Sequence, residues 1–195
     1  MDEYQQTPFS VDFDLEHGFS SSRYSTKRLL SQMKGIFNDT NEVEAILNHE
    51  GDKLIYEFYE LGLPQNSGEL QFGTSIVYPG KVGKEYNMTK GHFHEVLETA
   101  EVYYTLQGGG YMLMETPEGE WKAEPLEKGK ALYVPPRWAH RSINTSKKPL
   151  ITFFVFRGDA GHDYGTIETK GFRKLIVEGE NGQPEIIDNP AWIKE

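Results

Sequence analysis

Three histidines and one glutamate are the residues of this sequence that could act together in chemistry. His92 and His94 are separated by one residue, Phe93, so in an extended chain both imidazoles point to the same side. Glu101 follows shortly after, and His140 lies in a distant proline-rich segment. Three imidazoles and one carboxylate suit a divalent transition metal, and they leave room on an octahedral ion for water or substrate. A His-x-His pair alone is weak evidence, so this hypothesis depends on the sequence around it.

Short strands are expected to position these side chains. Alternating apolar runs are separated by a turn every eight to twelve residues, which favours an all-β sandwich or barrel over a βαβ sheet. The polar face of the predicted strand 100–107 would line the barrel interior, and its apolar face needs cover from N-terminal strands or a second subunit. The polar face carries Glu101, Tyr103 and Thr105, and the apolar face carries Val102, Tyr104 and Leu106.

The sequence divides the chain into three parts. We expect an N-terminal arm at 1–50 that packs on the barrel or on a second subunit, a barrel at 51–177 and a polar C-terminal tail at 178–195. The arm is expected to hold a short helix over 26–34 and a turn at 38–41. The expected strands are 53–60, 70–78, one that carries His92 and His94, 100–107, 111–115, 121–125, 131–134 and 150–156, with one or two more in 162–177.

Composition limits the partners. The chain has 195 residues, enough for one domain with a sizeable core, no cysteine and a formal net charge of -10. That charge argues against nucleic acid and anionic membranes, since both are bound through Lys and Arg. Residues 1–6 are polar and acidic, unlike a signal peptide, and no stretch is apolar enough to span a bilayer. We therefore expect a cytoplasmic protein with neither nucleic acid nor membrane as a partner.

Two segments resemble the motifs of the cupin superfamily. The first cupin motif is His-x-His, a glutamate, six residues and a glycine, and the second is Gly-x5-Pro-x-Gly-x2-His-x3-Asn. The resemblance implies a jelly-roll β-barrel with N-terminal extension strands and a few short helices. This sequence matches the first with His92, His94, Glu101 and Gly108, and the second with Gly129, Pro135, Arg137 in the place of glycine, His140 and Asn144.

The glutamate of the first motif has two candidates. Most cupins place it three or four residues after the second histidine, which here would be Glu98. Glu101 instead has the correct spacing to Gly108 and begins the strand that leads to that glycine turn. We favour Glu101 on these grounds and expect Glu98 to be solvated.

The longer gap and its surroundings resemble the cupin-type phosphoglucose isomerases found mainly in archaea. The similarity covers roughly residues 25 to 177 and is specific in combination. It is carried by Tyr78-Pro79-Gly80, the run from Met88 to His94, the run from Glu101 to Tyr104, the run from Pro135 to His140, and the stretch after Asp159.

This resemblance implies an enzyme that interconverts glucose 6-phosphate and fructose 6-phosphate. His92, His94, Glu101 and His140 would hold one divalent metal per subunit, with iron favoured and manganese, zinc, nickel or cobalt as alternatives. Glu101 would also carry the proton between C1 and C2 through an enediol, and a metal-assisted hydride shift is the competing mechanism. The family also implies a homodimer with exchanged strands.

The resemblance further implies contacts to the phosphorylated hexose. Each of these side chains has an alternative as a packing residue, above all the tyrosines. Phe156 stands where the family resemblance leads us to expect a tyrosine, so one contact would be missing or replaced. The implied substrate-binding residues are Ser75, Thr89, Gly91, Tyr103, His162 and Tyr164.

Two other functions are compatible with the same residues. A metal-dependent dioxygenase of the cupin type would consume oxygen together with an organic substrate. A non-catalytic sugar-binding cupin would keep the barrel and bind its ligand without turnover.

Overall fold

A computed structural model describes residues 7–21 and 24–193. The predictions for 1–6, 22–23 and 194–195, which belong to the expected N-terminal arm and C-terminal tail, lie outside the described residues.

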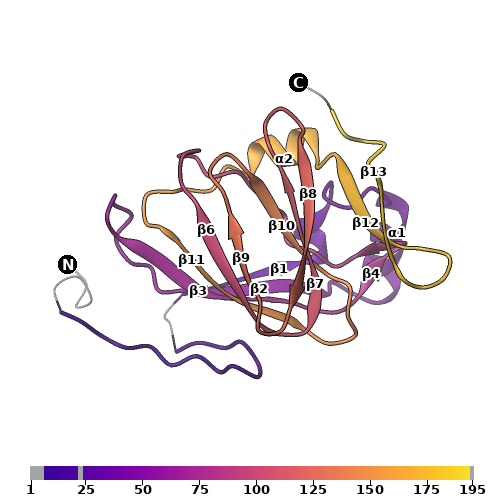
Figure 1. The fold of residues 1–195 in the computed structure, drawn as a ribbon. Helices are drawn as coiled ribbons and strands as arrows, with labels where there is room; N and C mark the ends of the chain where they lie inside the picture. The colour runs from indigo at the N-terminus through magenta and orange to yellow at the C-terminus, as the bar shows by residue number, and fades with distance from the viewer. Residues whose placement is uncertain (1–6, 22–23, 194–195) are drawn as a thin grey trace.

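Two antiparallel sheets face each other and form the barrel (Figure 1). The larger has the strand order β1-β2-β3-β11-β6-β9, and the smaller has the order β10-β7-β8. A third sheet, β13-β12-β5-β4, lies with α1 at one end of the barrel. The predicted all-β jelly-roll barrel with a few short helices is therefore confirmed.

The elements follow one another with short connections. The strands are β1 (Tyr24–Leu29), β2 (Leu54–Glu60), β3 (Leu70–Val77), β4 (Lys81–Val82), β5 (Glu85–Tyr86), β6 (Glu101–Gln107), β7 (Gly109–Glu115), β8 (Trp121–Glu127), β9 (Ala131–Val134), β10 (Ala139–Asn144), β11 (Leu150–Arg157), β12 (Lys174–Glu178) and β13 (Pro184–Asp188). The helices are the 3-10 turn η2 (Leu30–Met33), α1 (Thr40–His49) and α2 (Gly165–Lys170).

The alternation on β6 sets the orientation of the site. Along this strand, residues alternate between buried and exposed up to Thr105, with Glu101 and Tyr103 buried and Val102 and Tyr104 exposed. Its neighbour β11 is paired on both edges, to β3 and to β6. The predicted polar face of this strand therefore looks into the barrel.

Two predictions in the N-terminal arm were wrong. The expected helix over 26–34 is instead strand β1 followed by η2, because Tyr24–Leu29 pairs with β2 and takes its backbone hydrogen bonds from that strand. The expected turn at 38–41 is instead the start of α1. The Asp39 carboxylate accepts a hydrogen bond from the backbone N–H of Glu42 at 3.0 Å and caps this helix.

Three further segments differ from expectation. His92 and His94 do not lie on a named strand: His92 makes a single antiparallel bridge to His140, and Phe93 bridges Asp163. His140 itself lies on β10 and not in a turn. The C-terminal tail contains β13, which pairs with β12 over five residues and places Ile186 and Ile187 directly across from Ile176 and Leu175.

Residues 7–21 run along the outer face of the larger sheet. The Phe13 ring lies edge-on to Phe153 with centroids 5.4 Å apart, and the Gly18 carbonyl accepts a hydrogen bond from the Thr74 hydroxyl at 2.5 Å. The outer faces of β6 and β9 have no such cover from the described residues. Their exposed apolar side chains are Val102, Tyr104 and Tyr133.

The segment after β11 is fixed to the barrel by the Glu115 carboxylate, which is fully buried. One carboxylate oxygen lies 3.2 Å from Lys170 Nζ and accepts a hydrogen bond from Trp192 Nε1 at 3.0 Å. The other accepts from the backbone N–H of Arg173. Since Lys170 ends α2, this cluster holds α2, and the loop before it, against β7.

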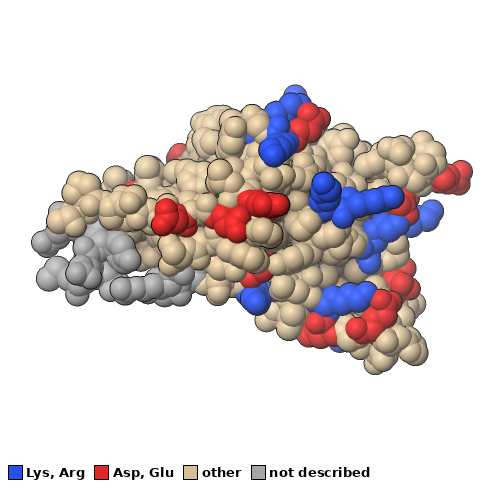
Figure 2. Space-filling view, turned by 90° about the horizontal axis from the view of Figure 1, so that it is seen from below, with Lys and Arg blue, Asp and Glu red and all other residues tan. Residues whose placement is uncertain are grey.

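Several basic side chains on the surface are paired with acidic ones. Lys34 lies 2.6 Å from Glu44, and Lys81 pairs with Glu178. Figure 2 shows basic side chains on this face lying beside acidic ones. No helix among the described residues has the length and apolar character needed to cross a membrane.

Candidate metal centre and substrate pocket

The four predicted metal ligands come together inside the barrel. One ligand atom from each of His92, His94, Glu101 and His140 lies within 4.8 Å of the others. They come from three places in the chain: the segment before β6, the start of β6 and β10. Glu98, the alternative carboxylate, is exposed to solvent and lies outside this group.

Hydrogen bonds on the far side of two rings set their tautomers. The Thr99 hydroxyl donates to the Val96 carbonyl at 2.7 Å, so its oxygen accepts from Nδ1–H of His94, also at 2.7 Å. His140 Nδ1 lies 3.4 Å from the Trp138 carbonyl, which can only accept. In both rings the proton therefore sits on Nδ1, and the Nε2 lone pair faces the interior.

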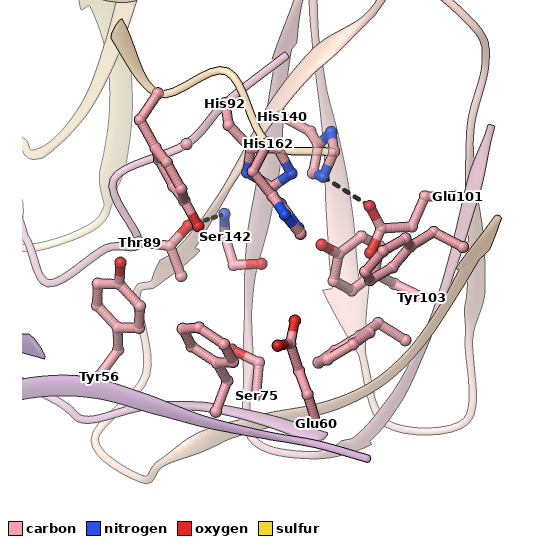
Figure 3. Close-up of a pocket in the computed structure, with 15 residues that line it drawn as sticks. Tyr56, Glu60, Ser75, Thr89, His92, Glu101, Tyr103, His140, Ser142 and His162 are labelled. Carbon is pink, nitrogen blue, oxygen red and sulfur yellow. Dashed lines mark hydrogen bonds and ion pairs between the residues drawn. The ribbon is translucent and has the colours of Figure 1, made fainter. Parts of the chain in front are cut away.

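The interior arrangement fits a cation. Nε2 of His140 lies 2.9 Å from a Glu101 oxygen (Figure 3), and Nε2 of His94 lies 3.2 Å from the same oxygen. Two neutral Nε2 lone pairs facing a carboxylate repel it unless a positive charge lies among them. Nε2 of His92 is buried and has no hydrogen-bond partner among the described residues. An ion bound by all four groups would satisfy every one of these atoms.

The protonation states agree with this interpretation. Burial raises the pKa of the Glu101 carboxyl, but positive charge and hydrogen bonds from His140 and His94 outweigh burial and bring it down to about 2, and a bound cation would supply that positive charge when both imidazoles are neutral. Burial, reinforced by the neighbouring imidazoles, lowers the pKa of His92 well below its usual value. An ionised carboxylate and a neutral imidazole are the forms that bind metal.

Replacing Thr99 with valine tests the orientation of His94. The substitution keeps the shape of the side chain and removes the nearer of the two oxygens that accept from Nδ1–H, leaving the Thr99 backbone carbonyl at 3.2 Å. We expect the dissociation constant for the metal to rise about 10-fold, as is usual when a ligand histidine loses its outer hydrogen bond. Competition with a chelating dye measures this constant.

Thr105→Val is the matched control. Thr105 is buried on β6, and its hydroxyl has no hydrogen-bond partner among the described residues. We expect this variant to bind the metal as the wild type does. Equal metal affinity in Thr99→Val and Thr105→Val would contradict the orienting role of Thr99.

A pocket opens beside the ligand cluster, and all six predicted substrate-binding residues line it. Figure 3 shows the hydroxyls of Thr89, Ser75 and Ser142 on one side of this pocket and Glu101 with Tyr103 on the other. His162 lies against the ligands, with its ring centroid 4.5 Å from that of His92. The predicted substrate-binding residues in the lining are Ser75, Thr89, Gly91, Tyr103, His162 and Tyr164.

Comparison with known proteins places the chain in a family. A family model for glucose-6-phosphate isomerase matches residues 27–192. The chain belongs to the glucose-6-phosphate isomerase family. A glucose-6-phosphate isomerase of Thermococcus litoralis is 48% identical over 185 residues, which cover 95% of this chain and 96% of that protein. A glucose-6-phosphate isomerase of Thermococcus gammatolerans is 45% identical over 190 residues, which cover 97% and 98%.

Among solved structures, an oxalate oxidase resembles this glucose-6-phosphate isomerase family member in its fold, with a TM-score of 0.49. The two are 12% identical in sequence, and the match covers 60% of this chain and 58% of that one.

Several pocket residues of this glucose-6-phosphate isomerase family member were missed from the sequence. Tyr56, Phe58 and Glu60 are successive inward residues of β2, and Ser142 faces inward on β10. Residues 54–60 show no clear period-2 alternation, so the sequence does not tell which of their faces looks inward; that depends on the partner strands. Phe156 also lines the pocket and carries no hydroxyl with which to bind a sugar or phosphate.

Gly91 explains how the chain can place His92 against β10. Its φ is +77°, and a Cβ there would lie 2.6 Å from the Phe172 ring and 3.1 Å from the His140 carbonyl oxygen. Only glycine fits such a close approach in the left-handed region.

Proposed function

We propose that this chain interconverts glucose 6-phosphate and fructose 6-phosphate with the help of one divalent transition metal, iron favoured. The observation that carries the proposal is the ionised Glu101 carboxylate at the wall of a pocket in a chain of this family. Manganese, zinc, nickel and cobalt are chemically suited to the same three imidazoles and one carboxylate.

Glu101 is proposed to move the proton. It is ionised at neutral pH, so it can take the proton from C2 of the open-chain aldose, as O1 gains a proton to form the C1–C2 enediol, and return it at C1 as the O2 hydroxyl loses its proton. A bound divalent metal would stabilise negative charge that develops on the sugar oxygens. Tyr103, the next inward residue on β6, lies close to Glu101, and burial together with that carboxylate raises the pKa of its phenol. Tyr103 therefore stays a hydrogen-bond donor during the reaction.

The opposite end of the pocket is proposed to bind the phosphate. Thr89, Ser75 and Tyr56 present hydroxyls there, and Gly91, two residues after Thr89, also lines the pocket. Arg28 stands directly across from Tyr56 in the β1–β2 pairing, so both side chains project from the same face of the sheet. A guanidinium beside several hydroxyls suits a phosphate dianion.

The test is conversion of fructose 6-phosphate by the purified, metal-loaded enzyme. We expect glucose 6-phosphate to form without oxygen uptake at an electrode. In D2O, proton transfer through Glu101 would introduce deuterium from solvent at C2. Oxygen consumption would instead indicate a dioxygenase, and calorimetric binding without product would indicate a sugar-binding protein.

We also propose that two copies of the chain form a homodimer. The exposed apolar side chains Val102, Tyr104 and Tyr133 lie together on the outer faces of β6 and β9, where β6 and β9 are themselves paired. A contiguous apolar patch of this kind is typical of an interface. Light scattering at micromolar concentration is expected to give twice the chain mass, and the mass of a single chain would refute the proposal.

A further inference from the structure

A second carboxylate, Glu60, faces the pocket across from His92 and His140. It is the last residue of β2 and follows Tyr56 and Phe58 on the inward face of that strand. Figure 3 shows its carboxylate directed into the pocket, between Ser75 and Tyr103. The proposed metal site does not use it, and the proposed proton transfer does not require it.

The strand register shows where Glu60 lies relative to Tyr103 on β6. Glu60 pairs with Gly73 on β3, Gly73 pairs with Phe154 on β11, and Phe154 pairs with Tyr103 on β6. Directly paired residues of an antiparallel sheet project to the same face, so Glu60 and Tyr103 belong to one row that crosses the pocket wall. With strands about 4.8 Å apart, their Cα atoms are separated by roughly 14 Å along the curved sheet. Glu60 therefore faces the reacting end of the pocket across a space in which a substrate could lie.

The environment of Glu60 gives it no partner within the described part of the chain. No side-chain hydrogen bond or ion pair to its carboxylate is formed there, although the side chain is half-buried. Burial, and after it the negative charge of Glu101, raises the pKa of Glu60. The rings of Phe58, Phe154 and Phe156, which line the same pocket, cannot donate hydrogen bonds. A half-buried acid without a partner among the described residues costs stability, which is typical of a group kept for binding.

We propose that Glu60 binds the polyol part of the substrate by accepting hydrogen bonds from its hydroxyl groups, and so orients the sugar with its phosphate at the other end of the pocket. An ionised carboxylate only accepts, and its two oxygens match two neighbouring hydroxyls. The same negative charge repels a phosphate, whereas Arg28 and the Thr89 and Ser75 hydroxyls attract one. This inference rests on the proposed function, because it takes the substrate to be a phosphorylated sugar.

The test compares two ligands on the metal-loaded wild type and on Glu60→Gln. Fructose 6-phosphate engages both ends of the pocket, and inorganic phosphate engages only the hydroxyl-lined end. Because hydrogen bonds to a charged group are strong, we expect the KM and the calorimetric dissociation constant for fructose 6-phosphate to rise about 10-fold or more. The inhibition constant of inorganic phosphate should stay the same or fall. The melting temperature should not fall, because an unpaired half-buried charge has been removed.

Controls separate this role from the alternatives. Glu69→Gln removes an exposed acid at the end of the loop that follows β2 and should match the wild type in every measurement. A fructose 6-phosphate constant within twofold of the wild type in Glu60→Gln would overturn the proposal. Equal weakening of both ligands with a lower melting temperature would also overturn it and assign Glu60 to the fold. A wild type that binds fructose 6-phosphate without converting it rejects the proposed function, while the two binding constants still test Glu60.

Discussion

Replacing Glu101 with glutamine is expected to lower kcat about 1000-fold while the dissociation constant of fructose 6-phosphate changes less than about 10-fold. Glutamine has nearly the same shape as glutamate and keeps one oxygen that can face the cation. It loses the negative charge and, with it, the ability of an ionised carboxylate to accept a proton. A coupled assay gives kcat, and calorimetry gives the binding constant.

The control for this experiment is Glu98→Gln, three residues away. Glu98 is exposed and stands outside the ligand group, so its variant should keep full turnover. Metal content must be measured on both variants, because lost metal would lower kcat for a different reason. Wild-type turnover in metal-loaded Glu101→Gln would reject the proposed role of this carboxylate.

Much of the candidate site was accessible from the sequence because its key strand has a simple pattern. In residues 101–105 every second side chain is polar, which is the period of a strand with one face in a polar interior. The histidines do not need a regular strand to come together, since a single bridged pair between His92 and His140 is enough. The ring centroids of His92 and His140 are 4.5 Å apart.

The N-terminal errors have a physical cause in partner choice. Residues such as Arg28, Leu29 and Leu30 favour a helix locally, but β2 offers a complete ladder of backbone partners that the isolated segment cannot reveal. Helix α1 had a readable signal, because Asp39 is a good N-cap and Val43 and Ile46 are spaced for one buried face. Asn38 and Asn41, at the start of this helix, instead predict a turn.

Arg137 shows how a departure from a motif can leave the backbone unchanged. It is the one non-glycine residue with positive φ among residues 7–21 and 24–193, at 72°. The left-handed conformation that the motif glycine would provide is therefore retained at a cost of about 1–2 kcal/mol. Its backbone N–H donates to the Leu97 carbonyl at 2.7 Å, and its guanidinium pairs with Glu118 at 2.6 Å, which helps to hold the turn before His140.

Removing the metal is expected to abolish the conversion of fructose 6-phosphate, and adding Fe²⁺ or Mn²⁺ should restore it. Among the described residues, no Lys or Arg pairs with Glu101, so the metal-free site loses both charge balance and the group that would stabilise the developing negative charge. The metal-free protein should also melt at a lower temperature, since a ligand present at 1000 times its dissociation constant adds about 4 kcal/mol of stability.

Two histidine variants complete this experiment. His140→Ala should no longer retain the ion after gel filtration, whereas His49→Ala, at the exposed end of α1, should retain one ion per chain. Turnover that persists in chelator-treated protein shown to be metal-free would contradict the requirement for a metal.

Anomalous diffraction at the absorption edge of the bound metal tests the central claim most directly. We expect one peak per chain, within about 2.0–2.2 Å of Nε2 of His92, His94 and His140 and of a Glu101 carboxylate oxygen. A peak elsewhere in the chain, or a metal-loaded crystal in which Glu101 or His140 points away from the paired imidazoles, would contradict it.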